Sequence, residues 1–243
     1  HPRPPMRRID RRTFLRDAAV GTVAGTLLPG RLLAGTPARR PAWWPIDPVR
    51  IRGRVRSSGS GVGRAVVSDG LVAVATDADG YFELVSDGRQ RWLSLTLPSG
   101  HRVPTNPTGT ARLYRPITAD GGAMDAAFDL EPRRGGDEDH AFLLLADPQT
   151  QTQWEMDRMH AETVPDVRRT VAGNDGPVFG VACGDIMYDD LSLYPAYERA
   201  VAAMGVPFFQ VVGNHDLDFE GRTDEASTRT FQDRFGPARY SFD

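Results

Sequence analysis

Three short, mainly apolar runs in the second half of the chain constrain its fold more than any other feature. The runs are residues 141–146, 178–183 and 207–212. Stretches with helical spacing separate them, at about 154–172 and 194–204, and we expect the first to be broken near Pro165 because proline has no N–H to donate. Apolar strands that alternate with helices form a parallel sheet covered on both faces. The sequence therefore predicts an α/β domain over residues 138–243.

Each apolar run is followed at once by polar residues. The first is followed by Asp147-Pro148-Gln149, the second by Gly184-Asp185, and the third by Gly213-Asn214-His215-Asp216. Because the carboxyl ends of parallel strands meet at one edge, these side chains should gather there. Their oxygen donors suit hard or borderline divalent metals. We also expect Gly184 and Gly213 to let the backbone pass closely beneath the cluster.

This order of motifs resembles the signature of calcineurin-like metallophosphoesterases over about residues 138–243. The resemblance implies an α/β/β/α metallophosphoesterase sandwich, of which the N-terminal half is present. It also implies metal-dependent hydrolysis of phosphomonoesters or phosphodiesters at a dinuclear centre of Mn, Fe, Zn or Mg ions. Two such cations neutralise the phosphoester and lower the pKa of a water nucleophile.

The resemblance also assigns metal-binding roles. Asp147 and Gln149 would bind the first metal, Asp185 would bridge both metals, and Asn214 would bind the second. Gln149 departs from the family, most of which has histidine there. An amide oxygen is a harder and weaker ligand than imidazole, so the first site should favour iron, manganese or magnesium over zinc.

His215 would lie beside the scissile phosphate as an electrostatic stabiliser or general acid. A histidine in this role needs a partner that fixes its tautomer. By resemblance to the nucleotidase branch, Asp218 is the first candidate for this partner and for a catalytic role, and Asp189 is the second. Each of these two aspartates could equally be a carboxylate that only stabilises its loop.

The family also requires three histidines after the Gly-Asn-His motif, and no histidine follows His215 in this sequence. The 243 residues alone are therefore expected to bind metal poorly and to have little activity. The alternative is a non-catalytic extracytoplasmic binding protein with a degenerate phosphoesterase domain. Sequence beyond Asp243 would separate the two, because a retained Gly-His-x-His motif favours the enzyme.

The residues before the α/β domain read as all-β. Between residues 49 and 131, short alternating runs are separated by the turn signals Ser68-Asp69-Gly70 and Asp77-Ala78-Asp79-Gly80. Strands this short with turns this frequent predict a small β-sandwich. The segment resembles transthyretin-like or carboxypeptidase-regulatory-like modules, which precede the catalytic domain in some exported calcineurin-like phosphoesterases. We interpret Asp77 and Asp79 as turn carboxylates rather than calcium ligands.

The N-terminal residues read as an export signal. Arg11-Arg12-Thr13-Phe14-Leu15 precedes a mild apolar run, which resembles a twin-arginine signal over residues 1–40, with a Pro-rich linker at 41–48. We therefore expect passage through the Tat export machinery and an extracytoplasmic location. No run is long enough for a stable membrane span.

Charge and cysteine content narrow the function classes further. Residues 1–40 hold nine arginines against two acids, a net charge of +7, so the net charge of −3 for the whole chain leaves −10 for the rest. An acidic body argues against nucleic-acid partners and leaves a small-molecule or cell-envelope phosphoester as the expected substrate. The lone cysteine, Cys183, excludes an internal disulfide framework and a cysteine-based zinc site.

Overall fold

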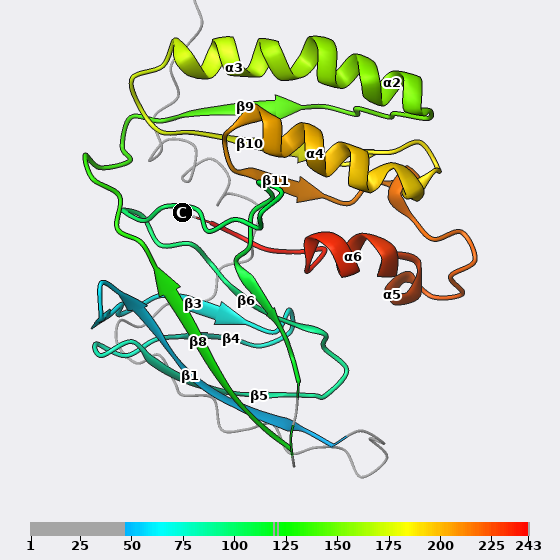
Figure 1. Ribbon diagram of the computed structural model, residues 1–243. Coiled ribbons are helices and arrows are strands. Elements are labelled where there is room, and N and C mark those ends of the chain that lie inside the picture. The colour runs from blue at the N-terminus through cyan, green and yellow to red at the C-terminus, as the bar shows by residue number, and fades with distance from the viewer. Residues whose placement is uncertain (1–46, 119, 121, 243) are drawn as a thin grey trace, which may run out of the picture. The chain divides into compact units, whose positions relative to one another are not determined.

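The computed structural model describes residues 47–118, 120 and 122–242 (Figure 1). The predicted signal at 1–40 and most of the predicted linker at 41–48 lie outside these residues. The described residues all belong to one compact unit. Within the described part of the chain, no helix has the length and apolar character needed to cross a membrane.

Two four-stranded sheets form the first part of this unit. In one sheet, β1 (Val49–Ser57) pairs antiparallel with β2 (Ser60–Gly61) and β5 (Tyr81–Ser86), and parallel with β8 (Ala123–Leu130). The other sheet has the order β4-β3-β6-β7, with the strands Ala73–Ala75, Val66–Ser68, Trp92–Leu95 and Tyr114–Pro116. The short strands expected from the sequence are present, and mainly apolar residues fill the positions that face inward.

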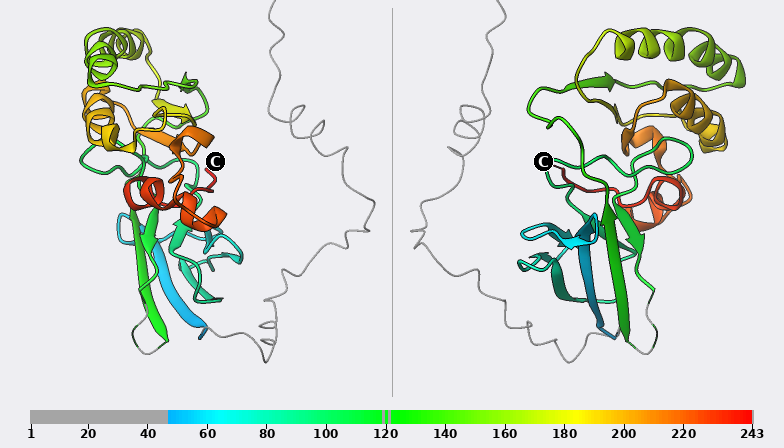
Figure 2. Two further views of the ribbon diagram at one scale, coloured as in Figure 1. Left: turned by 90° about the vertical axis from the view of Figure 1, so that its right-hand side faces the viewer. Right: turned by 60° about the vertical axis from the view of Figure 1, so that its left-hand side comes forward.

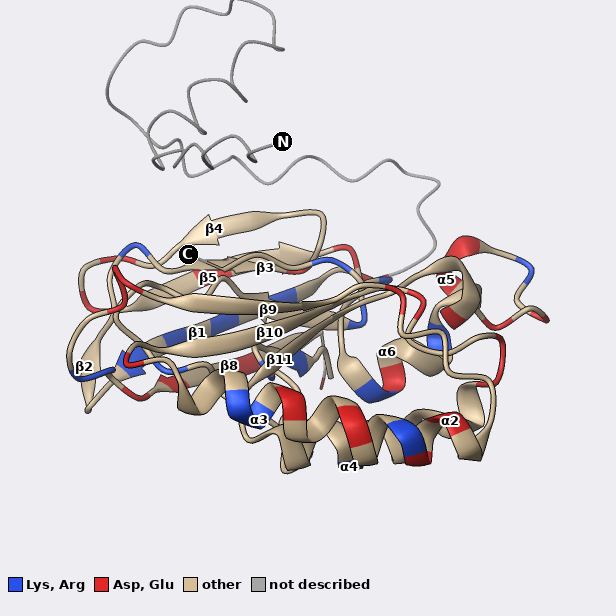
Figure 3. Cartoon of the chain, turned by 90° about the horizontal axis from the view of Figure 1, so that it is seen from above, with Lys and Arg blue, Asp and Glu red and all other residues tan. Residues whose placement is uncertain are grey.

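Strand β1 shows why the two sheets pack together. Its apolar residues Val49, Ile51 and Val55 are buried in one cluster with residues of the second sheet such as Leu93. Its arginines at 50, 52, 54 and 56 alternate with these residues, and Figure 3 shows the blue positions along β1. Ion pairs to Glu83 and Asp129 partner three of these arginines. This alternation buries one face of the strand and leaves the other charged.

The predicted turn carboxylate Asp77 has the expected local role. Its Oδ1 accepts hydrogen bonds from the backbone N–H groups of Asp79 at 3.0 Å and Tyr81 at 2.8 Å. These bonds close the turn that leads into β5, as aspartate side chains commonly do.

The second part of the unit is a three-stranded parallel sheet with helices. The strand order is β11-β10-β9, formed by Phe208–Val211, Val178–Cys183 and Ala141–Leu145. Helices α2 (Gln153–Arg158), α3 (Val164–Ala172) and α4 (Tyr194–Met204) lie on one side of this sheet in both views of Figure 2. The remaining helical segments are η3 (Leu191–Leu193), η4 (Asn214–Asp216), α5 (Asp224–Ser227) and α6 (Arg229–Phe235). The chain is thus mixed α/β, with all three predicted apolar strands and the α4 helix present.

The predicted break near Pro165 is confirmed in part, because the α-helix is interrupted before this residue and α3 begins with Pro165 in its first turn. A π-helical turn, η2 (Met159–Thr163), joins α2 to α3, and the N–H of Val164 bonds to the carbonyl of Met159. The wider π turn directly before Pro165 accommodates a residue with no N–H, so the helix continues. A capping box of Thr152 and Glu155 fixes the start of α2.

The expectation that both sheet faces are covered holds only in part. On the helix side, Phe208 is fully buried in the core formed with α2, α3 and α4, while the adjacent Phe209 belongs to the core of the two β-sheets. On β9, however, Phe142 and Leu144 point away from the helices and are 55% and 58% exposed. The described residues therefore cover the second face near β11 and leave it open at β9.

Candidate functional site

Strained backbone marks the ends of the first two parallel strands. Six described non-glycine residues have positive φ, and four of them lie in the segments that follow β9 and β10. These four are Asp147 (φ 43°), Gln149 (43°), Asp185 (45°) and Asp189 (66°). Left-handed backbone at ordinary residues costs on the order of 1–3 kcal/mol each and gathers at active sites and ligand clamps. The strain therefore singles out the edge that the sequence predicted as the site.

The Asp185 carboxylate joins the three strand ends. Its Oδ1 accepts a hydrogen bond from the backbone N–H of His215 at 3.0 Å, and its Oδ2 accepts one from Nε2 of Gln149 at 3.3 Å. The backbone N–H of Gln149 also donates to the carbonyl of Asp185 at 2.9 Å. The structure thus brings Gln149, Asp185 and His215 together from three different strands.

Two glycines make this arrangement possible, for different reasons. Gly184 has φ of +90°, a conformation that favours glycine. Gly213 has φ of −110°, which any residue can adopt, but a Cβ there would lie 2.0 Å from Oδ1 of Asp185. Gly213 is therefore required for space, so that the carboxylate can lie against the backbone.

The His215 ring is held on two sides. Its Nδ1 lies 2.7 Å from Oδ1 of Asp189, and the Tyr188 ring stacks on it with a centroid distance of 4.1 Å and an interplanar angle of 20°. The hydrogen bond with Asp189 raises the pKa of His215 above its ordinary value, against the opposing effect of desolvation. This pairing fixes the ring orientation and directs Nε2 away from Asp189.

Asp218 is the first candidate from the sequence for the partner of His215, but its carboxylate bonds to Thr230 instead. Its carboxylate accepts hydrogen bonds from the backbone N–H of Thr230, at 2.8 Å, and from the Thr230 hydroxyl. These bonds tie the loop after η4 to the start of α6. In this structure the second candidate, Asp189, partners His215 from the loop after β10, while Asp218 bonds to the start of α6. A catalytic role of Asp218 stays a prediction.

Asp216 is the residue that the sequence reasoning missed. It is fully buried, and its carboxylate accepts hydrogen bonds from the backbone N–H groups of Ile186, Met187 and Gly213 and from the Tyr194 hydroxyl, each at 3.0 Å. Burial raises the pKa of Asp216, and the backbone hydrogen bonds oppose that rise. Asp216 therefore links the loops after β10 and β11 to α4 and holds the strand ends in place.

The donor set fits a hard divalent cation in part. Asp147 and Asn214 are exposed, at the ends of β9 and β11. Gln149 and Asp185 lie side by side, with the Gln149 amide donating its Nε2–H to Asp185, and a cation between them would instead require the amide oxygen of Gln149. Within residues 47–242 as described, however, no three His, Cys, Asp or Glu side chains gather closely enough to hold a metal. The described residues thus supply a fraction of a coordination shell, of suitable chemistry.

Comparison with known proteins supports a phosphoesterase family from the β-sheet part of the chain. The family described as the N terminal of calcineurin-like phosphoesterase matches residues 49–133. This match covers the two β-sheets and stops before β9, so it supports a phosphoesterase family without reaching Asp147, Asp185 or His215. No curated protein matches the chain.

A solved structure also shows a limited similarity. It is a DUF3823 family protein from Parabacteroides merdae, with 16% identity and a TM-score of 0.25, covering 36% of this chain and 47% of that one. The chain therefore spans about half the length of that protein, and a similarity of this size carries no conclusion about fold or function.

Proposed function

We propose that this protein is a phosphoester hydrolase of the calcineurin-like kind, acting at the edge formed by the ends of β9, β10 and β11. The substrate would be a phosphomonoester or phosphodiester, either a small molecule or a component of the cell envelope. The observation that most directly supports this proposal is that Gln149, Asp185 and His215 converge from the ends of three strands. They meet at one edge of the sheet, where the backbone is strained. The family match at residues 49–133 supports the same class of hydrolase.

The oxygen donors would hold two divalent cations, of Mn, Fe, Zn or Mg. Asp147 and Gln149 are the proposed ligands of one cation, Asn214 of the other, and Asp185 of both. When bound, such cations supply positive charge at the phosphoryl group and acidify a water molecule. The chain itself contributes the hydrogen bond from Gln149 to Asp185, two residues that both have positive φ.

His215 is the proposed electrostatic stabiliser or general acid. Because Asp189 engages Nδ1, Nε2 is the ring nitrogen available to a phosphoryl or leaving-group oxygen. The stacked Tyr188 ring restricts rotation of the imidazole. Together these contacts fix the orientation of the imidazole and leave its Nε2 for the substrate.

The proposal includes an extracytoplasmic location. The twin-arginine pattern at residues 11–15 supports export in the folded state, with metal loaded before export. A reporter fused to residues 1–40 tests it: export should stop when Arg11 and Arg12 are both changed to Lys. Export that continues in this variant would contradict the location.

The function is tested by changing Asp185→Asn in the full-length protein. Turnover and metal content should be measured on a panel of monoesters and diesters with Mn, Fe, Zn and Mg. Loss of the carboxylate should lower activity by at least about 100-fold, because even partners one step removed from a metal cost 10–100-fold. Asp175→Asn, at an exposed loop position, is the matched control and should leave turnover unchanged.

Wild-type turnover in the Asp185→Asn protein would refute the site. Absence of hydrolysis by the wild-type protein with every ester and metal would favour the alternative, a non-catalytic extracytoplasmic binding protein.

A further inference from the structure

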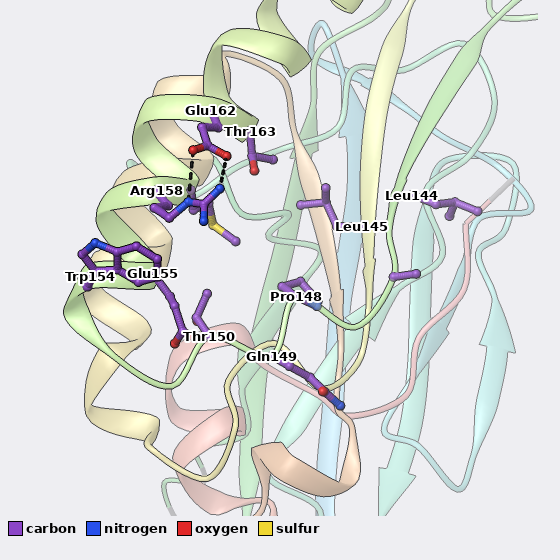
Figure 4. Close-up of a pocket in the computed structure, with 12 residues that line it drawn as sticks. Leu144, Leu145, Pro148, Gln149, Thr150, Trp154, Glu155, Arg158, Glu162 and Thr163 are labelled. Atoms are coloured by element: carbon purple, nitrogen blue, oxygen red, sulfur yellow. Dashed lines mark hydrogen bonds and ion pairs between the residues drawn. The ribbon is translucent and has the colours of Figure 1, made fainter.

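A cavity of about 520 Å³ lies between β9 and the helix that follows it. Figure 4 shows its two walls. Trp154, Arg158 and Glu162 come from the helix, and Leu145, Pro148 and Gln149 come from the strand and the loop after it. This volume falls within the range of pockets that bind small organic molecules.

The helical wall presents an exposed aromatic surface. Trp154 is 64% exposed, although a tryptophan side chain is among the most favourable to bury. The guanidinium of Arg158 lies 5.2 Å from the Trp154 ring centroid, and it donates two hydrogen bonds to Glu162, at 3.0 and 2.9 Å. The guanidinium therefore covers one face of the Trp154 ring and leaves the other face for a ligand ring.

The charge of the cavity argues against a phosphate group inside it. Its charged lining residues are Arg158, Glu155 and Glu162, which together carry a formal charge of −1. Glu162 neutralises Arg158, and the Glu155 carboxylate accepts hydrogen bonds from the backbone N–H groups of Gln151 and Thr152. With its single cation already paired, the cavity selects an uncharged ligand over an anion.

The helical wall is also irregular at this point. The π turn Met159–Thr163 contributes Met159, Glu162 and Thr163 to the lining. Single π turns inside α-helices are rare and occur frequently at functional sites. Here the turn lies beside the cavity and leaves a methionine, which adapts well to ligands of varied shape, in its wall.

The cavity adjoins the proposed site through one residue. Gln149 lines the cavity and donates to the Asp185 carboxylate, while Ala146 and Pro148, on either side of Asp147, also line it. We propose that this cavity binds the organic part of the substrate, an uncharged aromatic ring, with Trp154 as the stacking surface. This inference rests on the proposed function, since the ester oxygen would join the ring to the phosphoryl group at Asp185.

The test uses the full-length protein loaded with manganese, with 2-naphthol as a ring without phosphate. Calorimetric titration should show binding that Trp154→Ala weakens by about two- to tenfold, the range for one aromatic pair. Trp154→Phe should restore most of the affinity. The matched control is Tyr81→Ala, because Tyr81 is also an exposed aromatic residue, 54% exposed, with an arginine 4.7 Å from its ring. This control should bind like the wild type.

Kinetics provide the second measurement. Trp154→Ala should raise KM for 2-naphthyl phosphate by the same factor with kcat retained, and should leave KM for ethyl phosphate unchanged. The assignment would be overturned if Trp154→Ala raised KM equally for both esters. It would also be overturned if Trp154→Ala and the wild type bound naphthol with the same affinity. If the wild type hydrolyses neither ester, the proposed function and the substrate role of the cavity both fail, whereas the naphthol titration still shows whether the cavity binds a ring.

Discussion

The buried carboxylate of Asp216 offers the sharpest test of how the strand ends are held. Its four hydrogen-bond donors are three backbone N–H groups, of Ile186, Met187 and Gly213, and the Tyr194 hydroxyl. A carboxylate accepts on both oxygens, whereas an asparagine amide accepts on one side and donates on the other. In Asp216→Asn, the amide nitrogen must therefore face at least one backbone N–H that has no other acceptor in the described structure.

The magnitude follows from the number of bonds lost. Either orientation of the asparagine amide opposes two donors, and only the Tyr194 hydroxyl can rotate to relieve the conflict. Each hydrogen bond to a charged group contributes about 1.5–3 kcal/mol, and an unpaired buried donor costs about 1–3 kcal/mol. The neutral amide recovers some desolvation free energy of the buried Asp216 charge. We therefore expect a net loss in unfolding free energy of about 2–4 kcal/mol.

Urea denaturation followed by circular dichroism measures this loss by linear extrapolation. Tyr194→Phe removes a single donor and should cost about 1–2 kcal/mol. Asp175→Asn, the exposed control, should stay within about 0.5 kcal/mol of the wild type. A loss below about 1 kcal/mol in Asp216→Asn, beside an unchanged control, would refute the idea that this carboxylate organises the site.

Two further predictions concern other parts of the chain. The backbone N–H of Gly100 lowers the pKa of Asp137 below its ordinary 3.8, so Asp137 should stabilise the fold above that value and lose its contribution as pH falls through its folded pKa. The stability difference between the wild type and Asp137→Asn, from urea midpoints, should thus be present at about pH 7 and vanish well below pH 4, and a difference independent of pH would contradict this. Gln149→His should raise zinc affinity relative to manganese in competition dialysis, because imidazole is the softer ligand. Gln151→His, two residues away and exposed, is its control, and an unchanged preference in Gln149→His would argue against a ligand at that position.

The sequence predicted the elements well where local composition decides them. The strands β9, β10 and β11 are runs with few polar residues, so hydrophobicity alone located them. The helix over residues 153–172 was also located, but its π turn was not, because a proline signals a possible break and does not show how the helix accommodates it.

The location of the candidate site could be predicted from the sequence, but the hydrogen-bond partners of its residues could not. The residues after each strand identified the edge, since strand direction fixes where they emerge. Which carboxylate meets His215 depends on the path of the loop, so the sequence ranked Asp218 ahead of Asp189, whereas the structure pairs His215 with Asp189. The burial of Asp216 was likewise invisible, because an aspartate beside His215 reads as exposed until its four donors are known.

Adjacent phenylalanines on β11 have a consequence for how the molecule unfolds. Phe208 and Phe209 point in opposite directions, and each is buried in a different hydrophobic core. A strand that contributes to both cores cannot leave one without disturbing the other, so the β-sheets and the parallel sheet should melt in one cooperative transition. Removal of residues 49–131 would accordingly expose Phe209 to water and weaken the strand that carries Asn214 and His215.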